Sequence, residues 1–377
     1  MSPRGDPLES LRPHLTNRLP SPSAALFAGV VGDHPSTYSR SPAMWNAAFT
    51  ALGVPALYVP FDVPPTALEG FLATCRGVPQ LLGFNVTVPH KERVAPLLDE
   101  LTPEAALIGA VNLVTRTAEG RLVGANTDGP AILRALQERS GGPSGRAEGS
   151  ILVLGAGGAA RAAGVAFGAA WPHREILVHG RTPERAVEVT QMIQRAGGNA
   201  AMASAGALEA ALGGAAIIVN ASPVGMAGPI LTEAGVVWLE PFSALAPASP
   251  ASVPAGNGPW FEEDGRSPAG GPGLHPPLQW WRAAWPDIVR NLEVSLRRAL
   301  RLRPGAAILD LVYAPFETVF LKHARWTAHP AENGEIVLLR QAIDGCMRLC
   351  ESVLGGGARV DAERVMEQAM ARALREG

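Results

Sequence analysis

The feature that most constrains the fold is a glycine-rich turn between an apolar run and a helical pattern. Residues 155–160, Gly-Ala-Gly-Gly-Ala-Ala, fit the pattern GxGxxA and directly follow the apolar strand expected at 151–154. The first glycine makes a tight turn, the second lets the backbone approach a pyrophosphate, and the helix behind them offers N–H donors at its positive end. Against a purely structural turn, this context favours a Rossmann-like dinucleotide site at Gly155, Gly157, Gly158 and Ala159.

The next strand indicates which dinucleotide is bound. It is expected at 175–179 and is followed by Gly180, Arg181 and Thr182, with Arg185 one helical turn further on. An NAD enzyme normally places Asp or Glu at this strand end to accept from the ribose 2′-hydroxyl, and here there is none. The two arginines can pair with a 2′-phosphate, and Arg181 can stack on adenine. We therefore predict NADP; a solvated strand-end charge is the alternative for Arg181.

The rest of the chain alternates short apolar runs with amphipathic stretches, which is typical of an α/β protein. Strands are expected at 26–32, 56–60, 81–88, 215–220 and 307–312, with a hairpin of 110–116 and 122–125. Helices are expected at 41–52, 65–75, 94–101, 129–139, 159–168, 183–196, 286–302, 336–353 and 361–375.

Composition limits the partners of this chain. The net charge of -2 and the 18% of charged residues argue against a nucleic-acid groove or a membrane surface, and no apolar run is long enough to span a membrane. The scattered Cys75, Cys346 and Cys350 fit reduced thiols of a cytoplasmic protein. A metal pair at Cys346 and Cys350 is disfavoured against two core-facing thiols. We expect a small-molecule enzyme without a metal, as a monomer or homodimer.

The run NVTVPHKE, residues 85–92, places one lysine at the end of a buried strand. Alternation of polar and apolar residues over 85–88 predicts the strand, and Pro89 ends it because proline has no N–H for the ladder. Lys91 then opens a helix-like segment over 92–101, whose positive end would favour release of the lysine proton. For an isolated lysine, a solvated surface position is the more common arrangement.

Together these motifs resemble the shikimate dehydrogenase family, including its quinate/shikimate branch, over roughly residues 26–236 and 305–355. Any one motif alone is unspecific, but their order and spacing are specific. The matching motifs are Ser39-Arg40-Ser41-Pro42, 85–91, 109–112, Asn126-Thr127-Asp128-Gly129, 155–160, 220–226, 310–313 and Gln341.

The resemblance implies that Lys91 and Asp128 form a catalytic pair. Reduction of a carbonyl by hydride develops negative charge on oxygen, which a lysine ammonium can stabilise and protonate while the carboxylate orients it. The Asp128 carboxylate would favour retention of the Lys91 proton, whereas the positive helix end would favour its release. The resemblance also implies substrate contacts from Ser39, Ser41, Thr87, Asn112, Asp128, Tyr313 and Gln341, and cofactor contacts from Gly155, Gly157, Gly158, Ala159, Arg181, Thr182, Arg185, Asn220 and Gly334. The serines can equally cap the helix after Pro42.

The architecture expected on this basis is two α/β domains with the active site in a cleft between them. A discontinuous N-terminal substrate-binding domain covers 25–127 and 332–377, and a Rossmann-like NADP-binding domain covers 128–331. Residues 1–24 lack the apolar block of a secretory signal and are expected to be a disordered extension. A Pro/Gly-rich insertion at about 235–285 is expected to be disordered over 241–277, although its tryptophans suit packing on the body or on another chain.

The implied activity is the reversible NADPH-dependent reduction of 3-dehydroshikimate to shikimate, in the chorismate pathway of aromatic amino acid biosynthesis. A quinate/shikimate dehydrogenase and a non-catalytic ligand-sensing homologue are the alternatives. Four departures from the family pattern bear on the choice: Tyr38 for His, Leu113 for a small hydroxyl residue, Gly180 for Asn, and Glu335-Ile336 in place of a Leu-Gly pair beside the nicotinamide.

Overall fold

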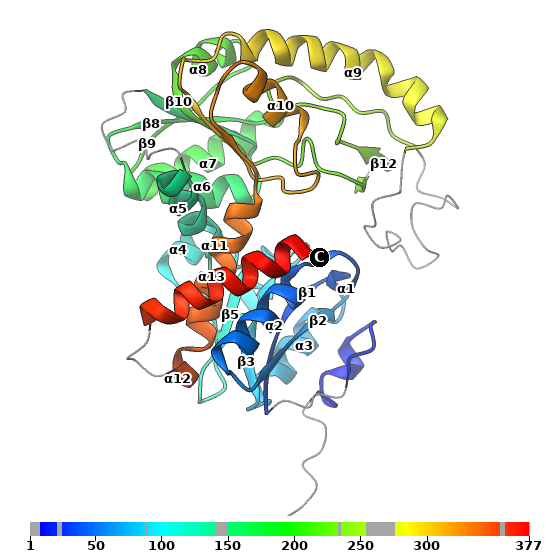
Figure 1. Cartoon of the computed structure of the whole chain (residues 1–377), viewed down its shortest axis with the longest axis vertical. Helices are drawn as coiled ribbons and strands as arrows, with labels where there is room; N and C mark the ends of the chain where they lie inside the picture. The colour runs from blue at the N-terminus through cyan, green and yellow to red at the C-terminus, as the bar shows by residue number, and fades with distance from the viewer. Residues whose placement is uncertain are drawn as a thin grey trace, which may run out of the picture. The chain divides into compact units, whose positions relative to one another are not determined.

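The chain folds into two compact α/β units (Figure 1). The structure is a computed structural model and describes residues 8–20, 25–87, 89–139, 149–232, 235–253, 276–354 and 359–376. The first unit comprises Met1–Asp128 with Leu339–Gly377, and the second comprises Gly129–Leu338. Both units combine a central sheet with packed helices, so the expected α/β fold class is confirmed.

A six-stranded mixed sheet forms the centre of the first unit. β1, β2 and β3 run parallel, β3, β5 and β6 alternate in direction, and β4 is parallel to β6. The expected hairpin is present as β5 and β6, and its turn holds Gly120 at a φ of 85°. In spatial order the strands are β2 (Ala56–Asp62), β1 (Leu26–Gly32), β3 (Leu81–Val86), β5 (Leu113–Arg116), β6 (Leu122–Ala125) and β4 (Glu100–Leu101).

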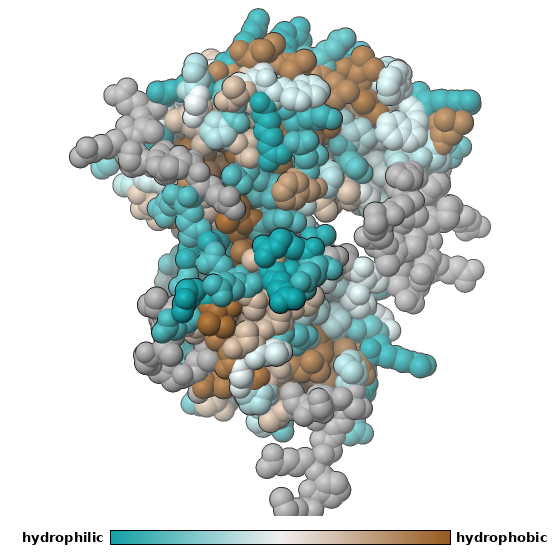
Figure 2. Space-filling view, in the orientation of Figure 1, coloured by the Kyte–Doolittle hydropathy of each residue, from teal (hydrophilic) through white to brown (hydrophobic). Residues whose placement is uncertain are grey.

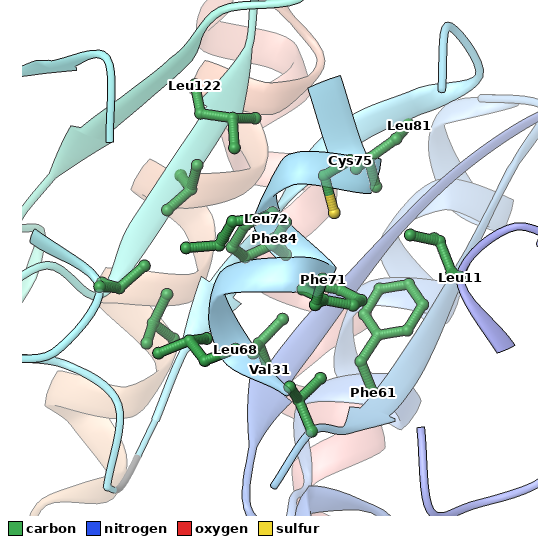
Figure 3. Close-up of a cluster of buried hydrophobic side chains, with 14 of the residues drawn as sticks. Leu11, Val31, Phe61, Leu68, Phe71, Leu72, Cys75, Leu81, Phe84 and Leu122 are labelled. Atoms are coloured by element: carbon green, nitrogen blue, oxygen red, sulfur yellow. The ribbon is translucent and has the colours of Figure 1, made fainter. Parts of the chain in front are cut away.

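Helix α3 (Leu68–Arg76) covers one face of this sheet because its apolar residues recur at helical spacing. Leu68, Phe71, Leu72 and Cys75 point into a buried cluster against strand residues that include Phe84 (Figure 3). The remaining helical segments of the unit are η1 (Arg12–His14), α1 (Pro35–Tyr38), α2 (Ser41–Leu52), η2 (Ala95–Leu97), α4 (Pro103–Ile108), α12 (Glu351–Leu354) and α13 (Arg359–Glu376). Helix α11 (Glu335–Leu349) begins in the second unit and belongs to the first from Leu339 onward.

The C-terminal helix α13 packs on α2 through one stripe of side chains. Ala362, Met366, Met370 and Leu374 recur every four residues and are all buried. The surface of α13 that is visible in Figure 2 is hydrophilic. The helix thus covers α2 with its apolar side and leaves its charged side in solvent.

The prediction of a disordered extension over 1–24 is wrong for residues 8–20. Leu8 and Leu11 are fully buried in the core of the first unit, where Leu11 lies beside the ring of Phe61 in Figure 3. The backbone N–H of Thr16 also donates to the carbonyl of Asp62 at 2.9 Å. Widely spaced leucines in a polar, proline-containing stretch give no periodic pattern, so their burial follows from tertiary packing. Residues 1–7 and 21–24 lie outside the described part of the chain.

The helix expected over 94–101 is also absent from the structure. Residues Ala95–Leu97 form one 3-10 turn, and Glu100–Leu101 form the edge strand β4. The cause lies between them: the Asp99 carboxylate accepts from the Arg76 guanidinium at 3.0 Å and from the Leu122 N–H at 2.7 Å. These contacts align the segment with β6, so that it forms an edge strand in place of the expected helix.

The second unit has the strand order of a Rossmann fold. Its six strands all run parallel, and the order reverses between β7 and β10. The strands in spatial order are β14 (Ala331–Glu332), β13 (Ala307–Asp310), β10 (Ala215–Asn220), β7 (Ser150–Leu154), β8 (Glu175–His179) and β9 (Asn199–Met202). The Rossmann-like arrangement expected from the glycine motif is confirmed.

Helices cover both faces of this parallel sheet. Strand β7 shows why, since Ile151 and Val153 belong to one buried cluster and Leu152 and Leu154 to another. Helices α5 (Asp128–Arg139), α6 (Gly158–Ala170) and α7 (Pro183–Arg195) contribute to the first cluster. Helices α8 (Leu208–Gly214), α9 (Leu278–Ala299) and α10 (Val319–Trp326) contribute to the second.

Part of the expected disordered insertion is instead packed on α9. A short hairpin of β11 (Pro229–Thr232) and β12 (Gly235–Trp238) leads into it, and Phe242 is fully buried. The Trp238 and Trp280 rings meet edge to face at 5.4 Å, and Trp280 donates to the Ala251 carbonyl at 2.6 Å. The disorder prediction is therefore wrong for 241–253, and one of the tryptophans packs on its own unit. Residues 254–275 lie outside the described ranges.

Helix α9 begins at Leu278, eight residues before the Pro286 start that the sequence suggested. Its Asn291 is buried and binds the packed segment through its amide. The amide oxygen accepts from the Ser243 N–H at 2.7 Å, and the nitrogen donates to the carbonyls of Ser243, Ala246 and Pro247 at 3.0–3.2 Å.

Replacing this amide by a side chain of similar volume should destabilise the fold. We expect Asn291→Leu to lower the free energy of unfolding by about 2–4 kcal/mol, because several buried backbone groups lose their partner. Urea denaturation followed by tryptophan fluorescence measures the change. Glu293→Gln, at an exposed position of the same helix, is the control, and equal stability of the two variants would contradict the account.

Candidate active site

The side chains of Lys91 and Asp128 form an ion pair in the first unit. The Lys91 Nζ atom lies 2.6 Å from Asp128 Oδ2, and the two side chains are 33% and 16% exposed. The lysine is therefore partly open to solvent, while its carboxylate partner is largely enclosed. The structure brings together the two residues that the sequence proposed as a pair.

Asn112 fixes the Asp128 carboxylate from the side opposite the lysine. Its Nδ2 atom donates to Asp128 Oδ1 at 2.7 Å and also lies 3.1 Å from Gln341 Oε1. Its Oδ1 atom accepts from the backbone N–H of Thr127 at 2.8 Å. Because Asn112 is 1% exposed, its amide has no room to turn. Each carboxylate oxygen of Asp128 thus has its own donor, and the carboxylate is held in one orientation.

Asn126 and Lys91 are themselves positioned by the backbone. Asn126 Oδ1 accepts from the N–H of Asp128 at 3.1 Å and so caps the start of α5. The Lys91 carbonyl accepts from the N–H of Val111 at 2.8 Å, which ties the turn after β3 to the residue before Asn112. The expected helix at 92–101 is absent, so the proposed effect of a helix end on Lys91 is wrong. Asp128 is the charged group that lies against this lysine.

The two predicted serines lie where α1 meets α2. Ser39 follows α1, Ser41 begins α2, and the Ser41 N–H donates to the Ser39 hydroxyl at 3.2 Å. Asp62, at the end of β2, holds this turn from beneath: its carboxylate accepts from the N–H of Ser36 at 2.9 Å and from the Ser36 hydroxyl. Thr87 follows β3, and its N–H donates to the Val31 carbonyl at 2.9 Å. All these residues belong to the same unit as Lys91.

In the second unit, the glycine loop has the shape that a pyrophosphate requires. Gly155 has a φ of 127°, and a Cβ there would lie 2.7 Å from the Ala221 carbonyl oxygen, so only glycine fits. A Cβ on Gly157 or Gly158 would meet nothing within 4 Å, and the loop is therefore open above α6. The first N–H groups of α6 have no acceptor within the helix. The loop lies at the switch point between β7 and β10, and its residues fit the dinucleotide.

The arginines that the sequence assigned to a 2′-phosphate lie at the end of β8 and on α7. Arg181, Thr182 and Arg185 are all exposed. Gly180, where the family often has Asn, has a tight contact with the glycine loop: a Cβ there would lie 3.0 Å from the Ala156 Cβ. The small residue thus lets the strand end and the loop approach each other, and it leaves the two guanidinium groups in solvent.

Asn220, expected beside the cofactor, lies at the start of the 220–226 loop. It is fully buried, and its amide donates to the Asp310 carboxylate at 2.8 Å and to the Val224 carbonyl at 3.0 Å, while Ser222 donates to its oxygen. All its polar atoms are used inside the protein. Asn220 therefore shapes the 220–226 loop, and the surface of that loop is left for any cofactor contact.

Asp310 is a fully buried carboxylate. No role was assigned to it from the sequence, although it is the first residue of the motif at 310–313. Besides Asn220, its donors are the Thr318 hydroxyl at 2.6 Å and the Val312 N–H at 3.0 Å. Burial raises its pKa to about 6. Its signal in the sequence is an acidic residue directly after three apolar strand residues, where a charge is not expected.

Tyr313 and Gly334 both belong to the second unit. Tyr313 is three residues after Asp310, and the Gly334 N–H donates to the Val312 carbonyl at 3.1 Å. Tyr313 is partly exposed. A Cβ on Gly334 would lie 2.3 Å from the Leu311 carbonyl oxygen, so glycine is required by this backbone contact. Ile336, the departure noted beside it, packs against the core of the unit.

Two further negative observations concern the described residues. No cluster of three or more His, Cys, Asp or Glu side chains is placed there to hold a metal ion, and Cys75, Cys346 and Cys350 are free and buried. None of the helices in these ranges is both long and apolar enough to cross a membrane.

The Rossmann unit with its open glycine loop, and the Lys91–Asp128 ion pair in the other unit, define the class of dinucleotide-dependent dehydrogenases. The model of the shikimate dehydrogenase substrate binding domain matches residues 30–114. The shikimate dehydrogenase (NADP(+)) of Geobacter sp. (strain M21) is 43% identical over 350 residues, which are 92% of this chain and 94% of that protein. The chain belongs to the shikimate dehydrogenase family, as its motifs indicated.

Two further comparisons point to the same family. The shikimate dehydrogenase (NADP(+)) of Rubrobacter xylanophilus is 46% identical over 202 residues, or 53% of this chain and 68% of that protein. The crystal structure of shikimate 5-dehydrogenase from Thermus thermophilus, in complex with NADP(H) and shikimate, matches with a TM-score of 0.61 and 30% identity. That match covers 92% of this chain and 99% of the Thermus chain.

Burial of Asp310 should make stability depend on pH in a direction opposite to that of most carboxylates. Its pKa is about 6 in the folded protein and 3.8 ordinarily, so between these values the folded state holds a proton that the unfolded state has lost. The free energy of unfolding should therefore fall as pH rises from 3.8 to about 6, by up to about 3 kcal/mol from this group.

Asp310→Asn, which mimics the protonated acid, should remove this contribution. We expect it to flatten the pH dependence of stability between pH 4 and 7 relative to wild type and to Glu293→Gln, as measured by urea denaturation at each pH. An unchanged slope in Asp310→Asn would show that the carboxyl group does not titrate in this range.

Proposed function

We propose that this protein is a shikimate dehydrogenase, which reversibly reduces 3-dehydroshikimate to shikimate with NADPH in the chorismate pathway of aromatic amino acid biosynthesis. The observation that carries the proposal is the Lys91–Asp128 pair, held in one orientation by Asn112 in a chain that is 43% identical to a shikimate dehydrogenase over nearly its whole length.

Lys91 acts as the general acid of the reduction. Bound NADPH supplies the hydride. As the carbonyl oxygen of the substrate gains negative charge, the Lys91 ammonium stabilises it and donates a proton to it. Asp128 accepts from Lys91 with one carboxylate oxygen and from Asn112 with the other, so it orients the ammonium and balances its charge. In the oxidation direction the same amine accepts the proton.

Small hydroxyl and amide groups bind the substrate. Ser39, Ser41 and Thr87 provide neutral hydroxyl donors for its carboxylate, and Tyr313 is assigned to the same end. Asn112 and Asp128 contact the ring hydroxyls together with Gln341. Since the Gln341 oxygen already lies against Asn112, its amide nitrogen remains to donate to a hydroxyl. This set of groups suits a hydroxylated ring acid rather than an apolar substrate.

The cofactor is NADP, bound by the glycine loop and the strand end of β8. Backbone N–H groups of Gly157, Gly158 and Ala159 would receive the pyrophosphate at the start of α6. Arg181 and Arg185, with Thr182 between them, offer exposed guanidinium groups to the 2′-phosphate. The absence of an acidic residue at 180–182 removes the usual partner of an unphosphorylated ribose.

Quinate oxidation and ligand sensing without catalysis are the competing functions. Both are compatible with the fold. Quinate differs by a hydroxyl on the carbon that bears the carboxylate, so the residues around Ser39 would decide between the two acids. The ordered ion pair of Lys91 and Asp128 favours catalysis over sensing, because a sensor has no use for an oriented proton donor.

Removal of the Lys91 ammonium should abolish most of the activity. We expect Lys91→Ala to lower kcat by about 10²–10⁴-fold with little change in the KM for NADP, because the general acid is lost while the nucleotide site is intact. Steady-state oxidation of shikimate, followed as NADPH absorbance, measures it. Lys322→Ala is the matched control, since Lys91 and Lys322 are the only lysines of the chain. Wild-type turnover in Lys91→Ala would place the proton donor elsewhere.

Removal of the Arg181 charge should weaken NADP selectively. We expect Arg181→Gln to raise the KM for NADP about 10- to 100-fold and to leave the KM for NAD unchanged, since only NADP carries the phosphate. The control is Arg195→Gln, which removes an exposed arginine at the far end of α7 and should leave both KM values as in wild type. A parallel rise in both KM values would contradict the assignment of Arg181 to the 2′-phosphate.

A further inference from the structure

Tyr58 is a buried tyrosine of the first unit that none of the roles above uses. It lies in β2, is 1% exposed, and its ring stacks on Trp45 of α2 at 4.6 Å. Its backbone is also fixed: Asn46 of α2 accepts from the Tyr58 N–H at 2.8 Å and donates to its carbonyl at 2.9 Å. Both ring and backbone are therefore held by α2, the helix that begins at Ser41.

The phenol hydroxyl of Tyr58 connects α2 to the proton-transfer pair. Tyr58 donates to Asn85 Oδ1 at 2.7 Å, and Asn85 Nδ2 donates to the Asn112 carbonyl at 3.2 Å. Asn112 in turn holds Asp128. A series of hydrogen bonds thus runs from Tyr58 to the Lys91–Asp128 pair, and the Tyr58 backbone is bonded to α2, the helix that begins at the proposed carboxylate-binding Ser41.

The direction of these hydrogen bonds is fixed by chemistry. A phenol hydroxyl has one proton, which Tyr58 gives to Asn85, so towards any other group its oxygen can only accept a hydrogen bond. Because Asn85 Oδ1 takes the phenol proton, its Nδ2 must face the Asn112 carbonyl. Burial raises the pKa of Tyr58 well above its ordinary value, and the phenol therefore stays protonated as a donor. The amide of Asn85 cannot turn without losing both bonds.

We propose that Tyr58 is a positioning residue, which sets Asn85 and Asn112 so that Asp128 holds the Lys91 ammonium in line with the substrate that Ser41 grips. The inference rests on the proposed function. A purely structural tyrosine would need the ring alone, and its contact with Trp45 would survive the loss of the hydroxyl. The proposal assigns the catalytic effect to that single oxygen.

Tyr58→Phe tests this because it keeps the ring and removes the hydroxyl. We expect kcat for shikimate oxidation to fall about tenfold, since small displacements of a catalytic group are costly. The KM for NADP should not change, because the nucleotide site is in the other unit. Thr74→Val is the control: it removes a side-chain hydrogen bond of 2.9 Å to His14, in the same unit but outside this series of contacts. It should leave kcat unchanged.

Labelling of Lys91 by acetic anhydride reads the same contact without turnover. With Lys322 as an internal reference, mass spectrometry should show faster acetylation of Lys91 in Tyr58→Phe than in wild type or in Thr74→Val, because the pairing with Asp128 is loosened. The two parts of the account then fail separately. An inactive wild type that still shows this labelling response would overturn the proposed function and support the role of Tyr58. If the wild type is active and Tyr58→Phe has the same kcat and the same rate of Lys91 acetylation, the proposed role of Tyr58 is overturned.

Discussion

The hydrogen bond from the Asn112 amide to the Asp128 carboxylate is the contact on which the rest of the candidate site depends. A lysine on a turn after a strand is ordinarily a mobile, solvated charge. Here its partner is a largely enclosed carboxylate whose second oxygen is already fixed at 2.7 Å by a buried amide. The ammonium of Lys91 is consequently paired, at 2.6 Å, with a carboxylate of fixed orientation. In a chain whose other basic residues are almost all arginines, which do not release protons, this is the residue suited to proton transfer.

The second unit uses a similar arrangement for a different purpose. Asp310 is also a buried carboxylate, and three donors on separate segments converge on it: Asn220, Val312 and Thr318. It ties together the ends of β10 and β13, and β10 is one of the two strands that flank the switch point where a parallel sheet binds its ligand. In the first unit a buried amide orients the carboxylate that pairs with Lys91, whereas in the second a buried carboxylate orients an amide and thereby shapes the 220–226 loop.

Much of this could be predicted from the sequence because the signals were local. Helix α2 has the predicted bounds, since Pro42 suits its first turn and Gly53 adopts a φ of 65° after its end. The glycine loop and the Lys91–Asp128 pair were likewise marked by motifs. The predictions that were wrong depended on distant partners: Leu11 is buried by tertiary packing, and Asp99 bonds its segment to β6. The hydrogen bonds through Tyr58 and Asn85 were not predicted at all, because they join residues on different strands. No local pattern encodes such contacts.

The central claim is that an oriented lysine and an arginine-lined nucleotide site serve one reaction on a hydroxylated ring acid. Steady-state kinetics of the wild-type protein with shikimate and quinate, each with NADP and NAD, test it most directly. The account predicts the highest kcat/KM for shikimate with NADP. Tight binding of these ligands without turnover in any combination would contradict it, because the Lys91–Asp128 pair would then have no catalytic role.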